Sequence, residues 1–322
     1  MSTEILLIIL GFIFLTKGAD LLVKSATSIA KRSGVSEMLI GLTIVAIGTS
    51  LPEIFITITS ATDGLSDLII GNAIGSCICN FLLVIGITSL IKPVKLSKRI
   101  VQKHLPIGMV AMVLLLFLGN TDTFGHVQII GRFEGLILIL CTVAYIMYTI
   151  YEEKKLKDTK MDKEVIDSVK AQGTHSVPVT VIYMILGILG LKFGSDFVVD
   201  NAILIAERFG LSEKFIGMTI VAVGTALPEI TTGIVAAMKG KTDLLLGNIA
   251  GSNILNLCLL IGLGAIISPL AYATAFNASI LILLAVTIFI RLIAALNKKR
   301  ELDGERGLFL IILYVFYIGS LL

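Results

Sequence analysis

A motif that occurs twice constrains this sequence more than any other feature. The first copy, GLTIVAIGTSLPE, begins at Gly41 and ends at Glu53, and the second, GMTIVAVGTALPE, ends at Glu229. The same offset of 176 residues relates other positions on both sides of the motif, including Asn80 and Asn256. Each copy carries a glutamate within an otherwise apolar segment. The chain is therefore predicted to contain two copies of one structural unit.

Composition places the chain in a lipid bilayer. Of 322 residues, 56% are hydrophobic and 15% are charged. Apolar runs of about 18 residues or more recur along the whole length, and a membrane-spanning helix needs ~20. The net charge of +3 is small and the basic residues lie between the apolar runs, so no nucleic-acid partner is indicated. The first run lacks a basic leader and a cleavage site, so we expect a retained span rather than a signal peptide.

The apolar runs predict an all-α integral membrane protein with ten transmembrane helices. The expected spans are residues 4–26, 37–62, 67–91, 104–120, 129–151, 177–199, 213–238, 243–268, 274–296 and 305–321. Five spans fall in a first repeat, residues 1–151, and five in a second, residues 177–322. The polar segment 152–176 has nearly balanced charge and few large apolar residues, so it is expected to be a solvated cytoplasmic linker with room for a short helix.

The basic residues predict the orientation of these spans. Short cytoplasmic loops collect Lys and Arg, and assigning alternate loops to the inside leaves only Arg132, Arg208 and Lys214 on the opposite side. Both termini are therefore expected to be extracellular, in a protein of the cell membrane. Because each repeat has an odd number of spans, the second enters from the opposite side. Such inverted repeats are typical of secondary transporters, which bind substrate near the membrane midplane between the repeats.

The repeated motif offers oxygen ligands. Its proline disturbs the preceding helical turn, which can free the backbone carbonyls of Ala46 and Ala222. Thr49 and Thr225 each precede the glutamate of their own repeat by four residues, so hydroxyl and carboxylate share one helix face. A charge in the middle of a span costs ~2.5 to 3.5 kcal/mol even on a lenient scale. Two such glutamates therefore indicate a function.

The span after each motif adds polar residues four positions apart. They are Asn72, Ser76 and Asn80 in the first repeat, and Asn248, Ser252 and Asn256 in the second. Carboxylates, hydroxyls, amides and carbonyls, without thiolate or imidazole, form a ligand set suited to Ca²⁺ or Na⁺. The alternative is that these small polar residues serve only helix packing. The glycine pairs Gly71 and Gly75, and Gly247 and Gly251, would serve packing in the same way.

These segments resemble a known family. GTSLPE with GNAIGSCICN, and GTALPE with GNIAGSNILN, are similar to the two alpha-repeats of the calcium/cation antiporter superfamily, specifically its compact prokaryotic sodium/calcium exchanger type. The resemblance covers nearly the whole chain. It implies ten helices, with helices 2, 3, 7 and 8 forming an ion core across which helices 1 and 6 slide to alternate access.

The resemblance also implies roles for individual residues, carried over by position. Calcium would bind Glu53 and Glu229, assisted by Thr49 and Thr225. Sodium sites would flank the calcium site, using Ser50, Ser76 and the Ala46 carbonyl on one side, and Ser252 and the Ala222 carbonyl on the other. Asn80 and Asn256 would line the middle.

Two positions depart from the family pattern. Ala226 stands where the first repeat has Ser50, which removes one hydroxyl from an expected sodium site. Asn256 stands where some members, including potassium-dependent exchangers, carry Asp, so a potassium site is not expected. With Glu53 and Glu229 ionised, the site holds two negative charges. One Ca²⁺, two Na⁺ or two protons would neutralise them, whereas three Na⁺ would leave an excess positive charge and make the cycle electrogenic.

The sequence therefore predicts an antiporter that exchanges Ca²⁺ for Na⁺, without enzymatic activity, cofactor or obligate protein partner. The alternative is Ca²⁺/H⁺ exchange, because buried carboxylates can carry protons themselves. A passive cation channel would need a continuous pore, normally around a symmetry axis. Inverted repeats with a single acidic pair favour alternating access instead. An intramembrane hydrolase would need an intramembrane His to activate a nucleophile or hold a metal, and the sequence offers none.

The remaining reactive residues receive structural interpretations. The cysteines within spans, Cys77, Cys79, Cys141 and Cys258, are expected to be packing residues. The histidines near span ends or in loops, His104, His126 and His175, are expected to be solvated. Lys17 and Lys192 are expected to extend to the interface or to pair with Asp20 or Asp196 rather than to act as gates.

Overall fold

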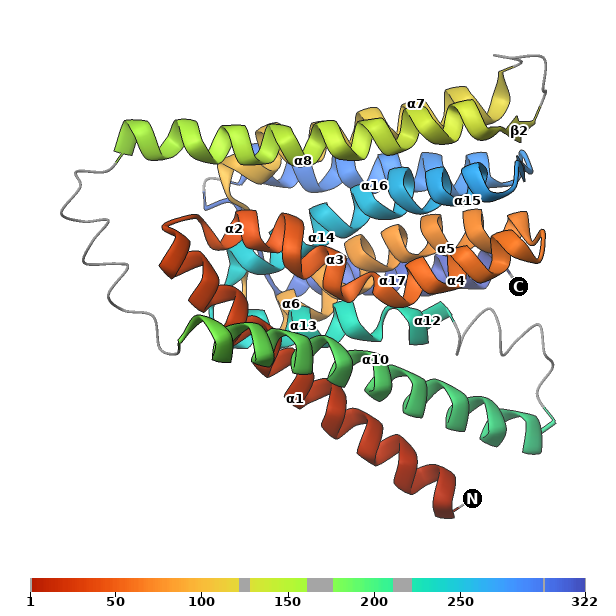
Figure 1. Ribbon diagram of the computed structural model, residues 1–322, viewed down its shortest axis with the longest axis horizontal. Helices are drawn as coiled ribbons and strands as arrows, with labels where there is room; N and C mark the ends of the chain where they lie inside the picture. The colour runs from red at the N-terminus through yellow and green to blue at the C-terminus, as the bar shows by residue number, and fades with distance from the viewer. Residues whose placement is uncertain (1, 122–127, 161–175, 211–221, 298, 322) are drawn as a thin grey trace.

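The computed structural model describes residues 2–121, 128–160, 176–210, 222–297 and 299–321. These residues are almost entirely helical and form an elongated bundle whose long helices run mostly along its longest axis (Figure 1). Seven of the described helices are long and apolar enough to cross a bilayer, or up to eight when the bent pair Glu37–Thr49 and Leu51–Thr62 is one span. The prediction of a helical membrane protein is confirmed.

The elements of the first half begin with a long helix. They are α1 (Ser2–Ser33), α2 (Glu37–Ile40), the π-helical turn η1 (Gly41–Val45), α3 (Ala46–Thr49), α4 (Leu51–Thr62), α5 (Ser66–Cys79), η2 (Asn80–Val84), α6 (Ile85–Ile91), β1 (Val94–Lys95), η3 (Ile100–His104), α7 (Leu105–Asn120), β2 (Ile129–Ile130) and α8 (Arg132–Lys160). Turns of π-helix are uncommon and frequently accompany functional sites.

The second half follows the same order. Its elements are α10 (Val177–Arg208), α12 (Ala222–Thr225), α13 (Leu227–Met238), α14 (Thr242–Ile254), η5 (Leu255–Leu260), α15 (Ile261–Ile267), β3 (Leu270–Ala271), α16 (Phe276–Leu296), β4 (Glu301–Leu302) and α17 (Gly304–Leu321). Both chain ends lie at one end of the bundle, and α8 ends at the opposite one (Figure 1).

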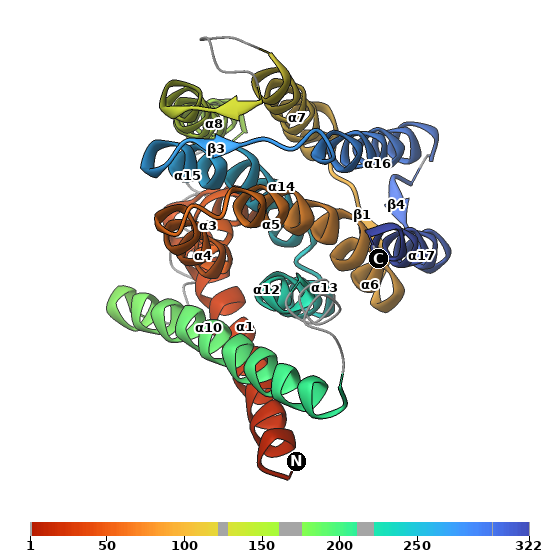
Figure 2. The ribbon, with the colours of Figure 1, turned by 90° about the vertical axis from the view of Figure 1, so that its right-hand side faces the viewer.

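Helices α1 and α10 pack against each other in opposite directions (Figures 1 and 2). A methyl group on Gly11 would lie 2.8 Å from the carbonyl oxygen of Gly194, and one on Gly18 would lie 2.8 Å from that of Gly187. Only glycine permits this backbone approach. The contacts are reciprocal, because Gly187 and Gly194 are the counterparts of Gly11 and Gly18 at the offset of 176 residues.

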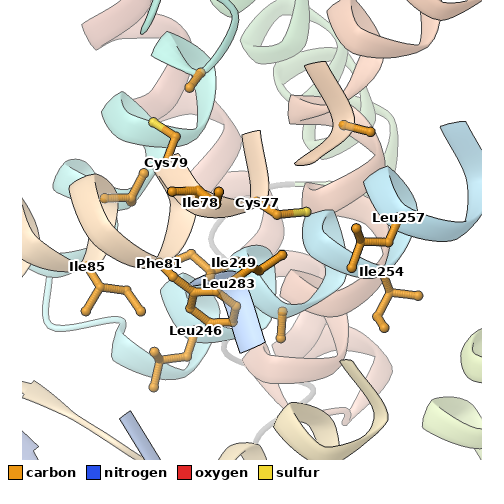
Figure 3. Close-up of a cluster of buried hydrophobic side chains, with 14 of the residues drawn as sticks. Cys77, Ile78, Cys79, Phe81, Ile85, Leu246, Ile249, Ile254, Leu257 and Leu283 are labelled. Carbon is orange, nitrogen blue, oxygen red and sulfur yellow. The ribbon is translucent and has the colours of Figure 1, made fainter. Parts of the chain in front are cut away.

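The centre of the bundle is built on α5 and α14. Every residue from Leu244 to Ile254 is buried. A methyl group on Gly251 would lie 2.5 Å from the carbonyl oxygen of Leu42, so α14 crosses η1 in backbone contact. Figure 3 shows apolar side chains of η2, α14 and α16 gathered in this core, including Phe81 and Leu283.

Two short antiparallel ribbons join connections from the two halves. Strand β1 pairs with β4, with Val94 opposite Leu302, and β2 pairs with β3, with Ile130 opposite Leu270. Strand β2 lies at the end of the bundle where both chain ends lie (Figure 1). Val94 and Leu270 are themselves related by the repeat offset.

The first two residues of the expected linker are not solvated. Helix α8 continues to Lys160, and Glu152 and Glu153 are buried. Arg99 donates to both carboxylates, at 3.2 Å to Glu152 and 2.6 Å to Glu153, and Lys103 also pairs with Glu152. The two acids are therefore held by the start of the fourth span. Residues 161–175 lie outside the described part of the chain, as do 213–221 of the seventh predicted span.

The expectation that His104 is solvated is also wrong. Its side chain is buried, with Nδ1 3.1 Å from the hydroxyl of Tyr145 and Nε2 3.7 Å from a Glu152 oxygen. A partner on a distant helix makes this burial possible, and local sequence does not reveal such a partner. His126 and His175 lie outside the described residues.

Most of the lysine and cysteine side chains discussed above lie as expected. Lys192 pairs with Asp196 at 2.6 Å, as expected. Lys17 is exposed, and Asp20 pairs instead with Lys24, at 2.7 Å, and with Lys239. The four cysteines are free thiols, and three of them are fully buried, which fits a packing role.

Candidate functional site

The two glutamates of the repeated motif lie at helix N-termini in the core. Glu53 is in the first turn of α4 and Glu229 is in the first turn of α13, and each follows a proline. Their side chains are 0% and 2% exposed. Within the described part of the chain, both carboxylate oxygens of Glu53 and Oε2 of Glu229 have no hydrogen-bond partner. Buried oxygens of this kind require an explanation, and cation binding supplies one.

Hydroxyls of the first half contact the second half around these acids. Thr49 Oγ1 donates to Oδ1 of Asn248 on α14 at 3.2 Å. Ser50 Oγ lies 3.2 Å from Ser252 Oγ and 3.5 Å from Glu229 Oε1. The candidate ligands of the two motifs therefore meet at the contact between the halves.

The amide-bearing residues also lie in this region. Asn80 Nδ2 donates to Oδ1 of Asn253 at 3.1 Å, and neither side-chain polar atom of Asn256 has a partner among the described residues. Ser76 is buried and Thr225 is partly buried. Asn253 was not anticipated, because its counterpart is Cys77 and no repeated polar pattern marks the position.

The expectation about freed carbonyls needs correction. The Ala46 carbonyl accepts the amide of Ser50 at 3.0 Å, so it stays in the helical hydrogen-bond ladder. A proline removes the bond to the carbonyl four residues before it, which for Pro228 is that of Gly224. That carbonyl accepts a hydrogen bond from Ser195 Oγ on α10, at 2.8 Å.

The turn after Ala222 differs from the one after Ala46. The amide of Ala226 donates to the carbonyl of Val223, three residues back, at 3.1 Å. In the first half, the corresponding amide bonds to the residue four positions back. The Ala222 carbonyl is therefore the better candidate for a carbonyl released from the ladder.

The ligand chemistry is that of a hard cation. Among the described residues, no three His, Cys, Asp or Glu side chains gather as a metal cluster. Around the glutamates the available partners are instead the neutral oxygens of Thr, Ser and Asn. Two carboxylates with neutral oxygens suit Ca²⁺ and Na⁺ rather than zinc or copper.

Comparisons with known proteins agree with this chemistry. Residues 3–151 and 179–322 match the sequence profile of a family described as "Sodium/calcium exchanger protein". The chain is 34% identical to the putative antiporter CaxA of Alkalimonas amylolytica over 98% of each chain. It is 30% identical to the sodium/calcium exchanger MaX1 of Methanosarcina acetivorans, over 99% of this chain and 98% of that one.

A solved structure also matches the fold over nearly the whole chain. The sodium-calcium exchanger NCX_Mj, soaked with zero Na⁺ and Ca²⁺, superposes with a TM-score of 0.82 over 99% of both chains at 30% identity. Sequence and structure thus agree over both halves. This chain belongs to the sodium/calcium exchanger family of membrane transporters.

Proposed function

We propose that the protein is a secondary antiporter of the cell membrane that exchanges Ca²⁺ for Na⁺ by alternating access. The observation that carries this proposal is the pair of buried glutamates, one from each half, next to hydroxyls that link the halves. Membership of the exchanger family supports the choice of ions. The ions are transported substrates, so no resident cofactor and no enzymatic step is needed.

The proposed ion ligands are the residues that correspond by position to the motifs of the family. Glu53 and Glu229 hold Ca²⁺, with Thr49 and Thr225 assisting. The flanking sodium ligands are Ser50, Ser76, Ser252 and the Ala222 carbonyl, with Asn80 and Asn256 in the middle. The Ala46 carbonyl is not included, because it already accepts the amide of Ser50 and the hydroxyl of Thr49. The contacts of Ser50 with Ser252 and Glu229 support a sodium site directly beside the calcium site.

Charge explains why such a site exchanges ions rather than leaking them. Two carboxylates in a water-poor interior repel each other and are costly to bury unless a cation accompanies them. Crossing the membrane with the site closed is therefore favourable only when Ca²⁺, Na⁺ or protons neutralise the pair. Ca²⁺/H⁺ exchange satisfies the same balance, and the buried glutamates would then carry the protons.

The proposed architecture is ten helices in two inverted repeats of five. Three observations support it: α1 and α10 run in opposite directions, their glycine contacts are reciprocal, and both chain ends lie opposite the end of α8. The basic loops place α8's end in the cytoplasm and the termini outside. We expect tags at residues 160 and 302 to report inside and terminal tags outside. A terminus on the same side as residue 160 would contradict the inverted arrangement.

Calcium uptake into proteoliposomes tests the function. Under an imposed outward Na⁺ gradient we expect uptake, whereas an outward proton gradient without Na⁺ should drive little. Uptake with the proton gradient alone would favour the Ca²⁺/H⁺ alternative. Calcium flux that persists without any counter-ion gradient would indicate a channel and contradict antiport.

A further inference from the structure

A basic pocket lies beside the ribbon of β1 and β4, away from the glutamates. Its volume is about 420 Å³, and it opens between η3 and α16. Lys98, Gln102, Arg291 and Arg300 supply its polar lining, while Ile288 and Leu292 supply part of an apolar wall. A second pocket, of about 470 Å³, shares Lys98 and Arg300 and adds Lys95, Lys299 and a single acid, Glu301.

The cations of the first pocket have no anionic partner within the described chain. Lys98, Arg291 and Arg300 take part in no ion pair there. Arg291 Nη1 lies 3.6 Å from the sulfur of Met109, a weak acceptor, and its Nε is buried without a partner. A guanidinium is suited to bind phosphate with several hydrogen bonds.

The neighbouring Arg99 shows that not every cation in this region lacks an anionic partner. Arg99 pairs with Glu152 and Glu153 within the protein, whereas the pocket cations have no such ion pair among the described residues. Glu152 and Glu153 are thus committed to Arg99 and Lys103, and Glu301 is the only acid among the described residues that lines either pocket. Among the described residues, one carboxylate thus lies beside several cations, and an anion from outside the chain would balance them.

The position of the pocket relative to the bilayer selects the anion. Arg291 precedes the end of α16 at Leu296 by five residues, which is about 8 Å along a helix. Leu292 and Leu296 are both exposed, so an apolar surface runs from the basic residues along the helix. A long arginine side chain at this depth can extend toward the interface, where the headgroup phosphates lie, and acyl chains cover such an apolar surface.

The other ribbon provides an internal control. At the repeat offset, Lys95 corresponds to Ala271 of β3, and Lys98 corresponds to Thr274. Arg291, in α16, corresponds to Leu115 in α7. The fold builds the ribbon of β2 and β3 without these cations, so the ribbon itself does not require them. A general preference for basic loops on one side accounts for Lys95 and Lys98 but not for an arginine within a span.

We propose that this pocket binds an anionic phospholipid, with the headgroup phosphate held by Arg291, Lys98 and Arg300. One acyl chain lies along Ile288 and Leu292. The lipid would brace the β1–β4 ribbon, which joins connections from the two halves. This site is separate from the ion site and does not depend on which ions are exchanged.

Native mass spectrometry of the purified full-length protein tests the site. Phosphatidylglycerol and phosphatidylcholine are titrated separately, and inorganic phosphate is added as a competitor. We expect phosphatidylglycerol to bind at least tenfold more tightly than phosphatidylcholine. The double variant Lys98→Gln/Arg291→Gln should lose most of this preference. Lys31→Gln, at an exposed lysine in the last turn of α1, is the matched control and should keep it.

Three outcomes would overturn the proposal. They are unchanged preference in the double variant, equal binding of the two lipids by the wild type, and displacement of the lipid by inorganic phosphate at equal concentration, which would indicate a soluble anion instead. Arg291→Lys keeps the charge and should retain most of the preference. Co-elution of all variants with the wild type in size-exclusion chromatography separates lost binding from lost folding.

Discussion

At the two helix breaks of the repeated motif, the break residues have nearly the same backbone dihedral angles but different neighbours. Ser50, at the first break, has φ −86° and ψ 8°, and Ala226, at the second, has φ −87° and ψ 0°. Ser50 faces Ser252 and Glu229 across the halves. The second break is instead connected to α10, where Ser195 donates to the Gly224 carbonyl.

This difference separates what the repeat determines from what single side chains determine. The repeat supplies the helix break, the proline and the buried glutamate in each half. Individual hydroxyls then connect the first break to Ser252 and Glu229, and the second to the long helix α10. At the repeat offset, Ser195 corresponds to Ala19 and Ser50 corresponds to Ala226, so each connection exists in one half only.

The largest effect is expected where the halves are alike. Glu53→Gln and Glu229→Gln each remove one of two ligand charges, so each should lower calcium transport in proteoliposomes by about 100-fold or more, while the protein remains folded in detergent. Glu207→Gln, at an exposed acid near the end of α10, is the control and should transport normally. Near-normal transport by either site variant would remove the central claim.

A smaller effect is expected at the connection of the second break to α10. Ser195→Ala leaves the Gly224 carbonyl buried without its 2.8 Å donor, which should cost about 1 to 3 kcal/mol of unfolding free energy. Ser25→Ala is the matched control on α1, because the Ser25 hydroxyl is buried without a partner among the described residues. Thermal unfolding in one detergent compares them. Equal losses in the two variants would show that the bond of Ser195 contributes nothing specific.

Sequence alone predicts the features that depend on local chemistry. The length of the apolar runs indicates the spans, because a helix must be apolar over the thickness of the bilayer to cross it. The cost of burying a charge in such a span singles out Glu53 and Glu229. The contacts of Thr49 and Ser50 with α14 are consistent with a site between the halves. The assignment of particular ions to these residues remains a prediction.

The features that sequence missed depend on partners distant in the chain. Glu152 and Glu153 look like solvated linker residues until Arg99 is known to lie beside them. The partner of the carbonyl released by Pro228 is a serine on α10, 33 residues before the proline, and no local pattern connects the two. Asn253 was missed because it breaks the repeat. Departures from the repeat are therefore where the structure adds most to the sequence.

The smallest effect should come from making the second break like the first. Ala226 is buried at the position that corresponds to Ser50, so Ala226→Ser should add one hydroxyl to an expected sodium site. One added ligand should matter more to Na⁺ than to Ca²⁺ held by two carboxylates. We expect a few-fold lower half-saturating Na⁺ concentration, or roughly 1 kcal/mol, with a smaller change in the apparent calcium affinity measured without sodium. Ser50→Ala should shift the sodium dependence in the opposite direction. If Ala226→Ser changes the proton dependence and leaves the sodium dependence unchanged, position 226 does not border a sodium site, and Ca²⁺/H⁺ exchange becomes the better explanation.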